Sequence, residues 1–416
     1  MPPPNVEGLK AVASNVVSPQ GRDISICNYC ASDDEKMWSE GETSYATGFT
    51  ALQLSCDAYQ KMLDRGWRRS GTYCYKPELK HSCCPQYTIK LDGVEFKPTK
   101  SQRKVVKRWT RFVVDGDGTR PPASPTSISP NEPQFSLVSS IHEPETGWNT
   151  GQTSHKFEVT LQPMSYTAEK YALYENYQVN AHQDSHNMPY LFYRFLVESP
   201  LLGEPIPYPS PPPPHLPTHY GSYHQLYRLD GRLIAFSVLD ILPTSISSVY
   251  FMYDKKWANF SLGKLSVLRE AALVKEIHDA GVPDMRSVFL GFYVHSNHKM
   301  RSKGAYSPSY LLDPEEYSWH PFQDCVGLLN RHRYACFSKP QHSLDGPAGP
   351  HEEGIPVIPD DVLDDTRFAQ TKEGGEVQVI PVKESDYWMD EMYMRPAMLT
   401  VMDSLGMELA KEVVFY

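Results

Sequence analysis

The sequence predicts an α+β fold in two domains, a Cys-rich basic domain followed by a larger domain built from strands around one long helix. Three observations support this prediction. Four cysteines occur early in two pairs, positive charge is concentrated over residues 61–111, and residues 222–295 show three strand patterns, a helix pattern and a fourth strand pattern. At 416 residues, the chain is long enough for two domains, each with its own core.

Composition limits the classes of protein to consider. Hydrophobic residues make up 40% of the chain and charged residues 22%, and the formal net charge is −10. The N-terminus MPPPNVEGLK lacks the apolar stretch of a signal peptide, and no run approaches the roughly 18 apolar residues of a membrane span. We therefore expect a protein of the cytosol or nucleus, without a membrane partner. In those compartments, eight cysteines favour metal or redox chemistry over disulfides.

The first 24 residues are expected to form a flexible tail, and residues 25–112 a Cys-rich domain. A short strand pattern over residues 23–30 carries Cys27 and Cys30, whose two-residue spacing lets both sulfurs reach one metal. Cys83 and Cys84 precede Pro85, which favours a backbone kink that lets both thiols bind one metal or cluster. Four such thiolates suit structural zinc or an iron–sulfur cluster, and two unrelated buried pairs are the alternative.

Residues 61–111 carry fourteen Lys and Arg against four Asp and Glu, a local excess of +10. Residues 44–67 show helical periodicity that ends near Gly66, residues 86–91 alternate as a strand, and a basic helix follows a cap at Thr99 or Ser101. Such a patch in an acidic chain favours binding to a nucleic-acid phosphate backbone, and a solvated basic surface is the alternative.

The second domain is expected over residues 151–340, after a linker at 113–150. It opens with a strand at 155–164 and a helix at 167–184, followed by an extended, mobile Pro-rich insertion at 200–217. Two strands then flank an Asp230-Gly231 turn, and a third strand precedes a helix that begins at Ser261 and Gly263. The N-terminus of that helix can receive an anion, but the motif is weak and a plain helix start is the more common explanation.

Residues 341–416 are expected to form an acidic extension. From residue 343 onwards there are sixteen Asp and Glu against five Lys and Arg, a net of −11. We expect a solvated segment; an alternative is that it folds back onto the basic patch and screens it.

Several strings occur together in order: C-x-x-C, DRGWRRSG, YKP, CCPQYTI, F-x-P-x-KSQRK, HQ-x-Y, VLDILP, SSVYF-x-YD, SLG, LRE, HS-x-x-KM, KG-x-Y-x-PS-x-LL and E-x-Y-x-W. In this combination, the chain resembles the eukaryotic arginyl-tRNA–protein transferases over about residues 27–320. Two positions depart from the family pattern. Asn297-His298 stands where Cys-Pro is common, and Asp313 stands where Cys is common.

The resemblance implies transfer of arginine from arginyl-tRNA to the α-amine of proteins that begin with Asp, Glu or oxidised Cys, which marks them as N-degrons for the ubiquitin–proteasome pathway. It also implies a GNAT-like second domain, arginyl-tRNA as co-substrate, acceptor proteins with acidic N-termini as partners, and no DNA. The ligands implied for zinc or an iron–sulfur cluster are Cys27, Cys30, Cys83 and Cys84.

Transfer of this kind needs no ATP, because the aminoacyl ester is already activated. The attacking α-amine, with a pKa of about 7.7–8.0, must be neutral, so the site has to accept a proton and stabilise an oxyanion. The catalytic candidates are Gln225, Asp240 and Glu270. The substrate-binding candidates are His224, Tyr227, Arg269, His295, Lys299 and Tyr306, with Lys299 or an Arg of the first domain expected to hold the acidic side chain. The tRNA-binding candidates are Arg65, Arg68, Arg69, Lys100, Arg103, Lys104, Ser261 and Gly263.

Each candidate also has a purely structural interpretation, such as an Arg269–Glu270 pair or a hydrogen-bonded His295 at a strand end. Two other functions remain open at this level. One is a cluster-bearing RNA-binding or redox-sensing protein without transfer activity. The other is a coenzyme A-dependent N-acetyltransferase, which would require a fuller glycine-rich phosphate loop than Ser261-Leu262-Gly263.

Overall fold

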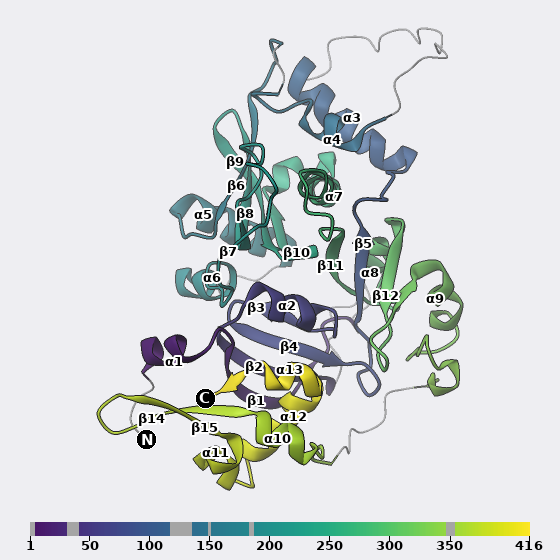
Figure 1. The fold of residues 1–416 in the computed structure, drawn as a ribbon. Coiled ribbons are helices and arrows are strands. Elements are labelled where there is room, and N and C mark those ends of the chain that lie inside the picture. Colours follow the sequence, from purple (N-terminus) through teal and green to yellow (C-terminus); the bar gives the residue numbers. More distant parts are fainter. Residues whose placement is uncertain (1–4, 31–40, 117–134, 149–150, 183–186, 347–353) are drawn as a thin grey trace. The chain divides into compact units, whose positions relative to one another are not determined.

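The computed structural model describes residues 5–30, 41–116, 135–148, 151–182, 187–346 and 354–416 (Figure 1). The chain divides into two compact units. Unit 1 comprises Met1–Lys90, Glu198–Glu204 and Leu290–Tyr416, and unit 2 comprises Leu91–Val197 and Pro205–Phe289. Both units contain helices and strands, in agreement with the mixed α and β content predicted. No helix in the described parts of the chain has both the length and the apolar character needed to cross a bilayer.

Unit 1 is built on a seven-stranded sheet with strand order β15-β14-β16-β1-β2-β4-β3. Its long central pair is antiparallel and aligns Ser18 with Thr50, while the last strand of the chain pairs in parallel with its neighbours on both sides. The strand bounds are β1 (Val16–Ile26), β2 (Glu42–Gln53), β3 (Arg68–Ser70), β4 (Tyr73–Glu78), β14 (Arg367–Thr371), β15 (Val377–Pro381) and β16 (Val414–Phe415).

Helices cover this sheet, and the fully buried Phe49, Trp67 and Phe415 lie in its core. The helices of unit 1 are α1 (Val6–Val12), α2 (Cys56–Leu63), α8 (His298–Arg301), α9 (Phe322–Leu329), α10 (Asp360–Asp365), α11 (Asp386–Met389), α12 (Met394–Leu405) and α13 (Met407–Lys411), with short 3₁₀ turns at Ser302–Ala305, Pro340–His342 and Val382–Glu384. Unit 1 also holds β12 (Ser309–Leu312) and β13 (Trp319–Pro321), and the chain passes between units within β5 (Tyr87–Asp92), β7 (Glu204–Pro205) and β11 (Ser287–Tyr293).

Unit 2 contains the strand order β11-β10-β9-β8-β6, in which only the β10–β11 pair is parallel. The bounds are β6 (Phe157–Pro163), β8 (His219–Leu229), β9 (Arg232–Ile241), β10 (Ser245–Tyr253), α3 (Lys100–Asp115), α4 (Leu137–His142), α5 (Ala168–Tyr177), α6 (Pro189–Leu196) and α7 (Leu262–Asp279), with a π-helical segment at Gln178–His182 and a 3₁₀ helix at Lys255–Phe260. The predicted strands and the predicted helix after Ser261 are confirmed. Asp230 and Gly231 have φ of 49° and 81°, as the tight turn between β8 and β9 requires.

The two faces of the unit 2 sheet differ in what covers them. Leu226, Phe236 and Met252 project onto the face covered by α5 and α6, where they pack around Phe192 and Leu196. Side chains that alternate with them project to the opposite face. Ser237 lies there, within 3.5 Å of a carboxylate oxygen carried by α7.

Several expectations about organisation are wrong. Residues 5–24 form α1 and most of β1 instead of a flexible tail, because Leu9, Val16 and Val17 are buried. Residues 42–53 form β2, since pairing with β1 and β4 overrides the helical pattern, and the helix is limited to α2. Residues 137–142 of the expected linker form α4; its residues 117–134 and 149–150 lie outside the described structure.

The expectation for the acidic segment, residues 341–416, is also wrong. It contributes strands and helices to unit 1, and Met398, Val401 and Leu405 of α12 are buried, so it is not a solvated extension. The domain division also differs from the expected one, because α3 belongs to unit 2. There its Trp109 packs edge-on against Phe157 and Phe260. In the Pro-rich segment, buried Ile206 and Leu216 fix a stretch that was expected to be mobile.

Candidate active site and metal centre

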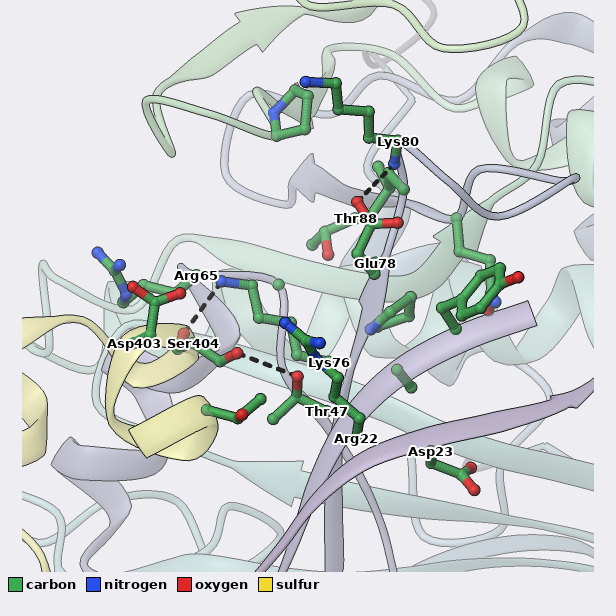
Figure 2. A pocket seen from close by; sticks show the side chains of 18 of the residues that line it. Arg22, Asp23, Thr47, Arg65, Lys76, Glu78, Lys80, Thr88, Asp403 and Ser404 are labelled. Atoms are coloured by element: carbon green, nitrogen blue, oxygen red, sulfur yellow. Dashed lines mark hydrogen bonds between the residues drawn. The ribbon is translucent and has the colours of Figure 1, made fainter. Parts of the chain in front are cut away.

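A cavity of about 280 Å³ opens in unit 1 between its sheet and α12 (Figure 2). Strands β1, β2 and β4 contribute Arg22, Thr47 and Lys76, and α12 contributes Ser404. The segment expected to be a solvated acidic extension therefore forms one wall of this cavity.

Two cations in the cavity flank one aromatic ring. The Arg65 guanidinium and the Lys76 ammonium each lie 4.2 Å from the centre of the Tyr317 ring. Lys76 Nζ donates to the Tyr317 hydroxyl at 2.7 Å and to the Ser404 carbonyl at 3.0 Å. Burial lowers the Lys76 pKa, and nearby Arg65 lowers it further. Bringing a second positive charge close to a half-buried lysine favours the binding of an anion.

Tyr317 has a φ of 54°, in the left-handed region that bulky residues rarely adopt. Such conformations cluster at ligand sites, because the surrounding structure must hold them in place. The sequence interpretation named Arg65 but missed Lys76 and Tyr317. Their strings, YKP and E-x-Y-x-W, were the signal that could have identified them.

The other two arginine candidates of the Cys-rich domain lie in an unexpected environment. Arg68 and Arg69 are only 6% and 4% exposed, and they donate to the carbonyls of Trp67 and Gly71 at 2.6 and 3.0 Å. Burial lowers the Arg68 pKa to about 10. Both side chains therefore lie in the interior, and they are not among the surface cations that a phosphate backbone would contact.

Lys303 is a half-buried cation that the sequence interpretation missed, although it belongs to the KG-x-Y-x-PS string. Its Nζ donates to the Phe292 carbonyl at 2.7 Å. Burial, with a smaller contribution from the charge of Arg68, lowers its pKa to about 8. A lysine with such a pKa can exchange a proton near neutral pH.

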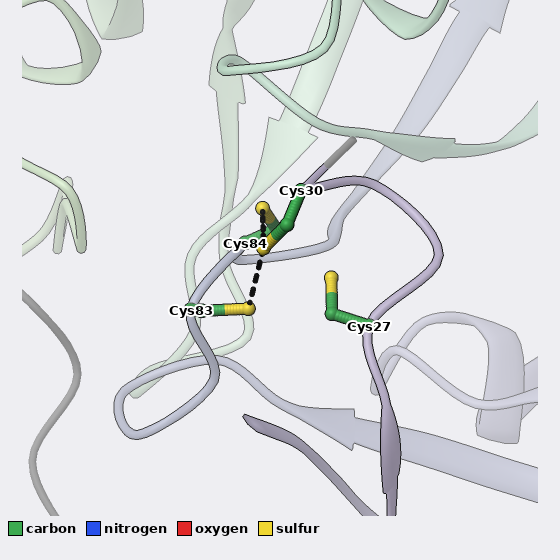
Figure 3. A group of neighbouring side chains, drawn as sticks. All are labelled: Cys27, Cys30, Cys83 and Cys84. Atoms are coloured by element: carbon green, nitrogen blue, oxygen red, sulfur yellow. Dashed lines mark hydrogen bonds between the residues drawn. The ribbon is translucent and has the colours of Figure 1, made fainter. Parts of the chain in front are cut away.

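The four predicted metal ligands converge in unit 1 (Figure 3). Cys27 and Cys30 follow β1, and Cys83 and Cys84 lie in the loop before β5. All four Sγ atoms lie within 4.8 Å of one another, and Cys30 Sγ is 3.1 Å from Cys83 Sγ and 3.5 Å from Cys84 Sγ.

The surroundings of these thiols suit a bound cation. Cys27 and Cys84 are buried beside Val294, with Met300 packed against the group. Burial, and then the hydrogen bond that Cys30 makes with Cys83, raises the pKa of Cys30 to about 12, and the pKa of Cys27 is raised chiefly by its hydrogen bond with Cys84. A metal binds cysteines as thiolates and offsets the cost of burying their charge, so this convergent donor set fits a metal.

In unit 2, two catalytic candidates lie on the face of the sheet that α7 covers. Gln225 pairs in register with Ser237, and the Tyr227 hydroxyl donates to Gln225 Oε1 at 2.8 Å. Glu270 of α7 is fully buried, and Ser237 Oγ lies 3.5 Å from its Oε1. Burial raises the Glu270 pKa to about 8, so this carboxyl group is mostly protonated at neutral pH.

The third catalytic candidate lies on the other face. Asp240 is fully buried and pairs in register with Ser222, whose hydroxyl donates to Asp240 Oδ1 at 2.6 Å. His224 shares this face, and its Nε2 lies 2.8 Å from the Leu196 carbonyl. The sheet therefore separates Asp240 and His224 from Gln225 and Glu270, and these residues do not form one cluster.

The remaining substrate-binding candidates are dispersed. Arg269 forms a buried ion pair with Glu145, and not with its neighbour Glu270. His295 bridges the Tyr293 hydroxyl at 2.8 Å and Asn330 Oδ1 at 3.0 Å, and burial lowers its pKa. Lys299 is exposed on α8, whereas Tyr306 is only 8% exposed.

The basic helix is confirmed as α3. Thr99 caps it, in a capping box with Gln102. Lys100 and Lys104 are exposed, and Arg103 lies 5.5 Å from the centre of the Phe135 ring. At the start of α7, Arg108 Nη2 lies 3.2 Å from Ser261 Oγ, and Gly263 is exposed.

Comparison with known proteins places these features in a family. Residues 25–104 match the family model described as "Arginine-tRNA-protein transferase, N terminus", and residues 169–313 match "Arginine-tRNA-protein transferase, C terminus". An arginyl-tRNA–protein transferase 1 of Drosophila melanogaster is 30% identical over 426 residues, covering 77% of this chain and 85% of that protein.

More distant relatives agree. An arginyl-tRNA–protein transferase 1 of Arabidopsis thaliana is 27% identical over 489 residues, covering 78% of this chain and 76% of that protein. An aspartate/glutamate leucyltransferase of Polynucleobacter asymbioticus is 26% identical over 260 residues, covering 61% of this chain and 78% of that protein. The chain therefore belongs to the arginine-tRNA–protein transferase family, whose members transfer arginine to protein N-termini.

Proposed function

We propose that this chain transfers arginine from arginyl-tRNA to proteins that begin with Asp, Glu or oxidised Cys, and so marks them for the N-degron pathway. The transfer reaction itself is supported by membership of the family. The acidic selectivity rests chiefly on the unit 1 cavity, in which Arg65 and Lys76 flank Tyr317. A relative whose name specifies aspartate and glutamate supports the same acceptor class.

The chemistry requires a neutral α-amine to attack the carbonyl carbon of the arginyl ester, with the tRNA hydroxyl as leaving group. The acceptor amine has a pKa of about 7.7–8.0, so a sizeable fraction is already neutral at physiological pH. The protein must hold both reactants in position and receive the proton that the amine loses on attack. Lys303, with its pKa of about 8, is mostly protonated at pH 7, so only its minor neutral form can receive this proton.

Glu270 suits a different role. Because its pKa is raised to about 8, it is mostly a neutral acid at pH 7 and a poor proton acceptor. We assign it a positioning role through Ser237, which lies beside Gln225 in the sheet. Gln225 itself is oriented by the Tyr227 hydroxyl, which donates to its Oε1 at 2.8 Å, as a group that contacts a reactant must be.

The acidic side chain of the acceptor would bind beside Arg65 and Lys76. Arginine and lysine recognise carboxylates through charge-assisted hydrogen bonds, and the partly buried cavity strengthens these relative to contacts in bulk water. An oxidised cysteine also presents negatively charged oxygen atoms and fits the same requirement.

The test compares Arg65→Gln with Lys372→Gln, which removes an exposed cation in the β14–β15 hairpin. For a peptide beginning with Asp, we expect Arg65→Gln to raise KM about tenfold or more, because a charged hydrogen bond is worth roughly 1.5–3 kcal/mol. The KM for arginyl-tRNA and all constants of the control variant should stay unchanged. An unchanged KM for the Asp peptide in Arg65→Gln would refute this pocket assignment.

For the four cysteines, we propose a metal centre of zinc or an iron–sulfur cluster. A tetrahedral zinc with bonds of about 2.3 Å spaces its sulfurs by about 3.8 Å. The convergence of all four Sγ atoms within 4.8 Å supports a single ion. Protein purified without oxygen should then lack the visible absorption of a cluster and contain zinc; strong visible absorption that dithionite bleaches would support the cluster instead.

We also propose that unit 2 is GNAT-like, supported by three antiparallel strands followed by α7 and a parallel β11. A crystal structure of the protein, superposed on known GNAT domains, would test this assignment; a sheet of different strand order would rule it out.

A further inference from the structure

A second group of metal-ligand side chains lies in unit 2, among residues to which the transfer reaction gives no role. His142, His215 and Glu276 each offer one ligand atom, and these atoms lie within 4.8 Å of one another. His142 ends α4, His215 belongs to the Pro-rich segment, and Glu276 lies in the last turns of α7. Three separate parts of the sequence therefore converge on one point.

The two imidazoles meet on the same carboxylate oxygen. His142 Nε2 lies 2.7 Å from Glu276 Oε1, and His215 Nε2 lies 2.9 Å from the same atom. Nitrogen and oxygen ligands bound to zinc at about 2.0–2.1 Å lie about 3.3 Å apart in a tetrahedron. Shifts of a few tenths of an ångström would therefore convert these contacts into a coordination site.

The other nitrogen of His142 has the partner that metal-binding histidines commonly have. Its Nδ1 lies 3.1 Å from Glu145 Oε2, within reach of an Nδ1–H donor, and Arg269 Nη1 lies 3.2 Å from the same nitrogen. A carboxylate at that position fixes the tautomer, orients the ring and leaves the Nε2 lone pair for a metal. Arg269 pairs with Glu145, so this second carboxylate is held in place and neutralised.

The charge balance of the group also favours a cation. Glu145 and Glu276 supply two negative charges and Arg269 one positive charge, which leaves a net of −1 when both histidines are neutral. His142 is 1% exposed, and the Glu276 side chain 8%. Glu276 Oε2 is buried and accepts no hydrogen bond from the described residues. The two histidines contact only Oε1, so a divalent ion would stabilise this buried carboxylate further.

We propose that His142 Nε2, His215 Nε2 and the Glu276 carboxylate bind one divalent transition-metal ion, with zinc the best match to this mixed nitrogen and oxygen set. The ion would tie α4 and the Pro-rich segment to α7. His142 lies outside the two segments that match the family models, so this site extends beyond the part of the chain that the models describe.

The test measures zinc content by mass spectrometry in the full-length protein after equilibration with micromolar free zinc and gel filtration. The variants are His215→Ala and Glu276→Gln, and the matched control is His219→Ala, an exposed histidine four residues from His215. We expect both variants to bind about one zinc equivalent less than the wild type, and the control to bind the wild-type amount. The cysteine site is intact in all four proteins and contributes equally.

A second readout protects the test against misfolding. Zinc should raise the melting temperature of the wild type more than that of Glu276→Gln, which keeps the size and hydrogen-bonding ability of the side chain. Equal zinc content and an equal zinc-dependent shift in all four proteins would overturn the proposal. The group would then be a protonated His142 shared between two carboxylates.

Discussion

Glu270 carries its carboxyl group into the interior of unit 2, where burial raises its pKa to about 8. In the unfolded chain, the pKa of a glutamate is about 4.3. Between these two values, the native protein binds one proton more than the unfolded chain. The free energy of unfolding should therefore fall as pH rises from about 4.3 to 8.

Replacing Glu270 with Gln should remove this contribution, because the amide does not ionise. The wild type should lose up to about 1.4 kcal/mol of stability per pH unit through this group, and Glu270→Gln should show a correspondingly flatter profile. Urea denaturation at a series of pH values between 5 and 8 measures the difference. Glu95→Gln, at an exposed glutamate of the same unit, is the control and should keep the wild-type slope. Parallel profiles for all three proteins would show that Glu270 is ionised in the native state.

Site residues were predictable from sequence where the chemistry depends on residue type and spacing. The four cysteines are the clear case, because thiols in two close pairs indicate a metal site directly, and their Sγ atoms do converge. The acid–base candidates were less predictable. Asp240 and Glu270 both occur in recognisable strings, but only the strand register shows that they lie on opposite faces of a sheet. Burial of Arg68 was likewise invisible, since a run of arginines usually lies on the surface.

Helix α3 presents a row of cations along its solvent-facing side. Lys104 and Lys107 are exposed, while Val105, Val106 and Trp109 of the same helix are buried. This amphipathic arrangement keeps the cations at the surface, where the phosphates of tRNA would meet them. The proposed tRNA contact therefore belongs to the helix as a whole.

The double variant Lys104→Gln/Lys107→Gln should weaken tRNA binding severalfold at low salt. Each lost phosphate contact lowers the slope of log K against log salt by roughly 0.7–0.9, so the double variant should lower it by about 1.5. Filter binding across a salt series measures both quantities. Arg194→Gln, which removes an exposed cation from α6, should leave the slope unchanged. An unaltered slope in the double variant would exclude this face of α3 from the tRNA contact.

Strand β16 shows that the end of the chain belongs to the core of unit 1. Phe415 is fully buried between β1 and β14, with which its strand pairs. We expect Phe415→Ala to destabilise the protein by about 3–5 kcal/mol, as is usual for a large aromatic side chain removed from a core. Val379→Ala, on β15 of the same sheet with 40% exposure, should cost far less. Thermal melting distinguishes the two, and a similar small loss in both would mean that the C-terminal strand contributes little.

Elements with strong local patterns were predictable, and those that depend on distant partners were not. The β8–β9 hairpin has two runs rich in aromatic and β-branched residues about an Asp-Gly turn, and α3 has a capping residue and an apolar face. By contrast, β1 and β16 are adjacent strands separated by almost the whole sequence, so local composition could not reveal their pairing. The acidic character of the last segment suggested a solvated extension, because its apolar positions are spread across several short elements.

Charge is distributed very unevenly over the whole molecule. Residues from 343 onwards carry −11, although the entire chain has a net charge of −10. Part of this negative charge is used within unit 1. Glu412 accepts from Lys61 at 2.8 Å, and Lys383 bridges Asp360 and Asp364 at 2.9 and 2.8 Å. These pairs are exposed, so each contributes little to stability. Of these two lysines, Lys61 lies outside the acidic segment and Lys383 within it, and six Lys and Arg lie on α3 of unit 2.

The measurement that tests the central claim most directly is mass spectrometry of a short peptide beginning with Asp, incubated with the purified protein and arginyl-tRNA. A peptide that differs only in beginning with Ala is the control. We predict the gain of one arginine at the α-amine of the Asp peptide and no gain on the Ala peptide. Equal modification of both would contradict the acidic selectivity, and no modification of either, with tRNA binding intact, would contradict transfer by this chain.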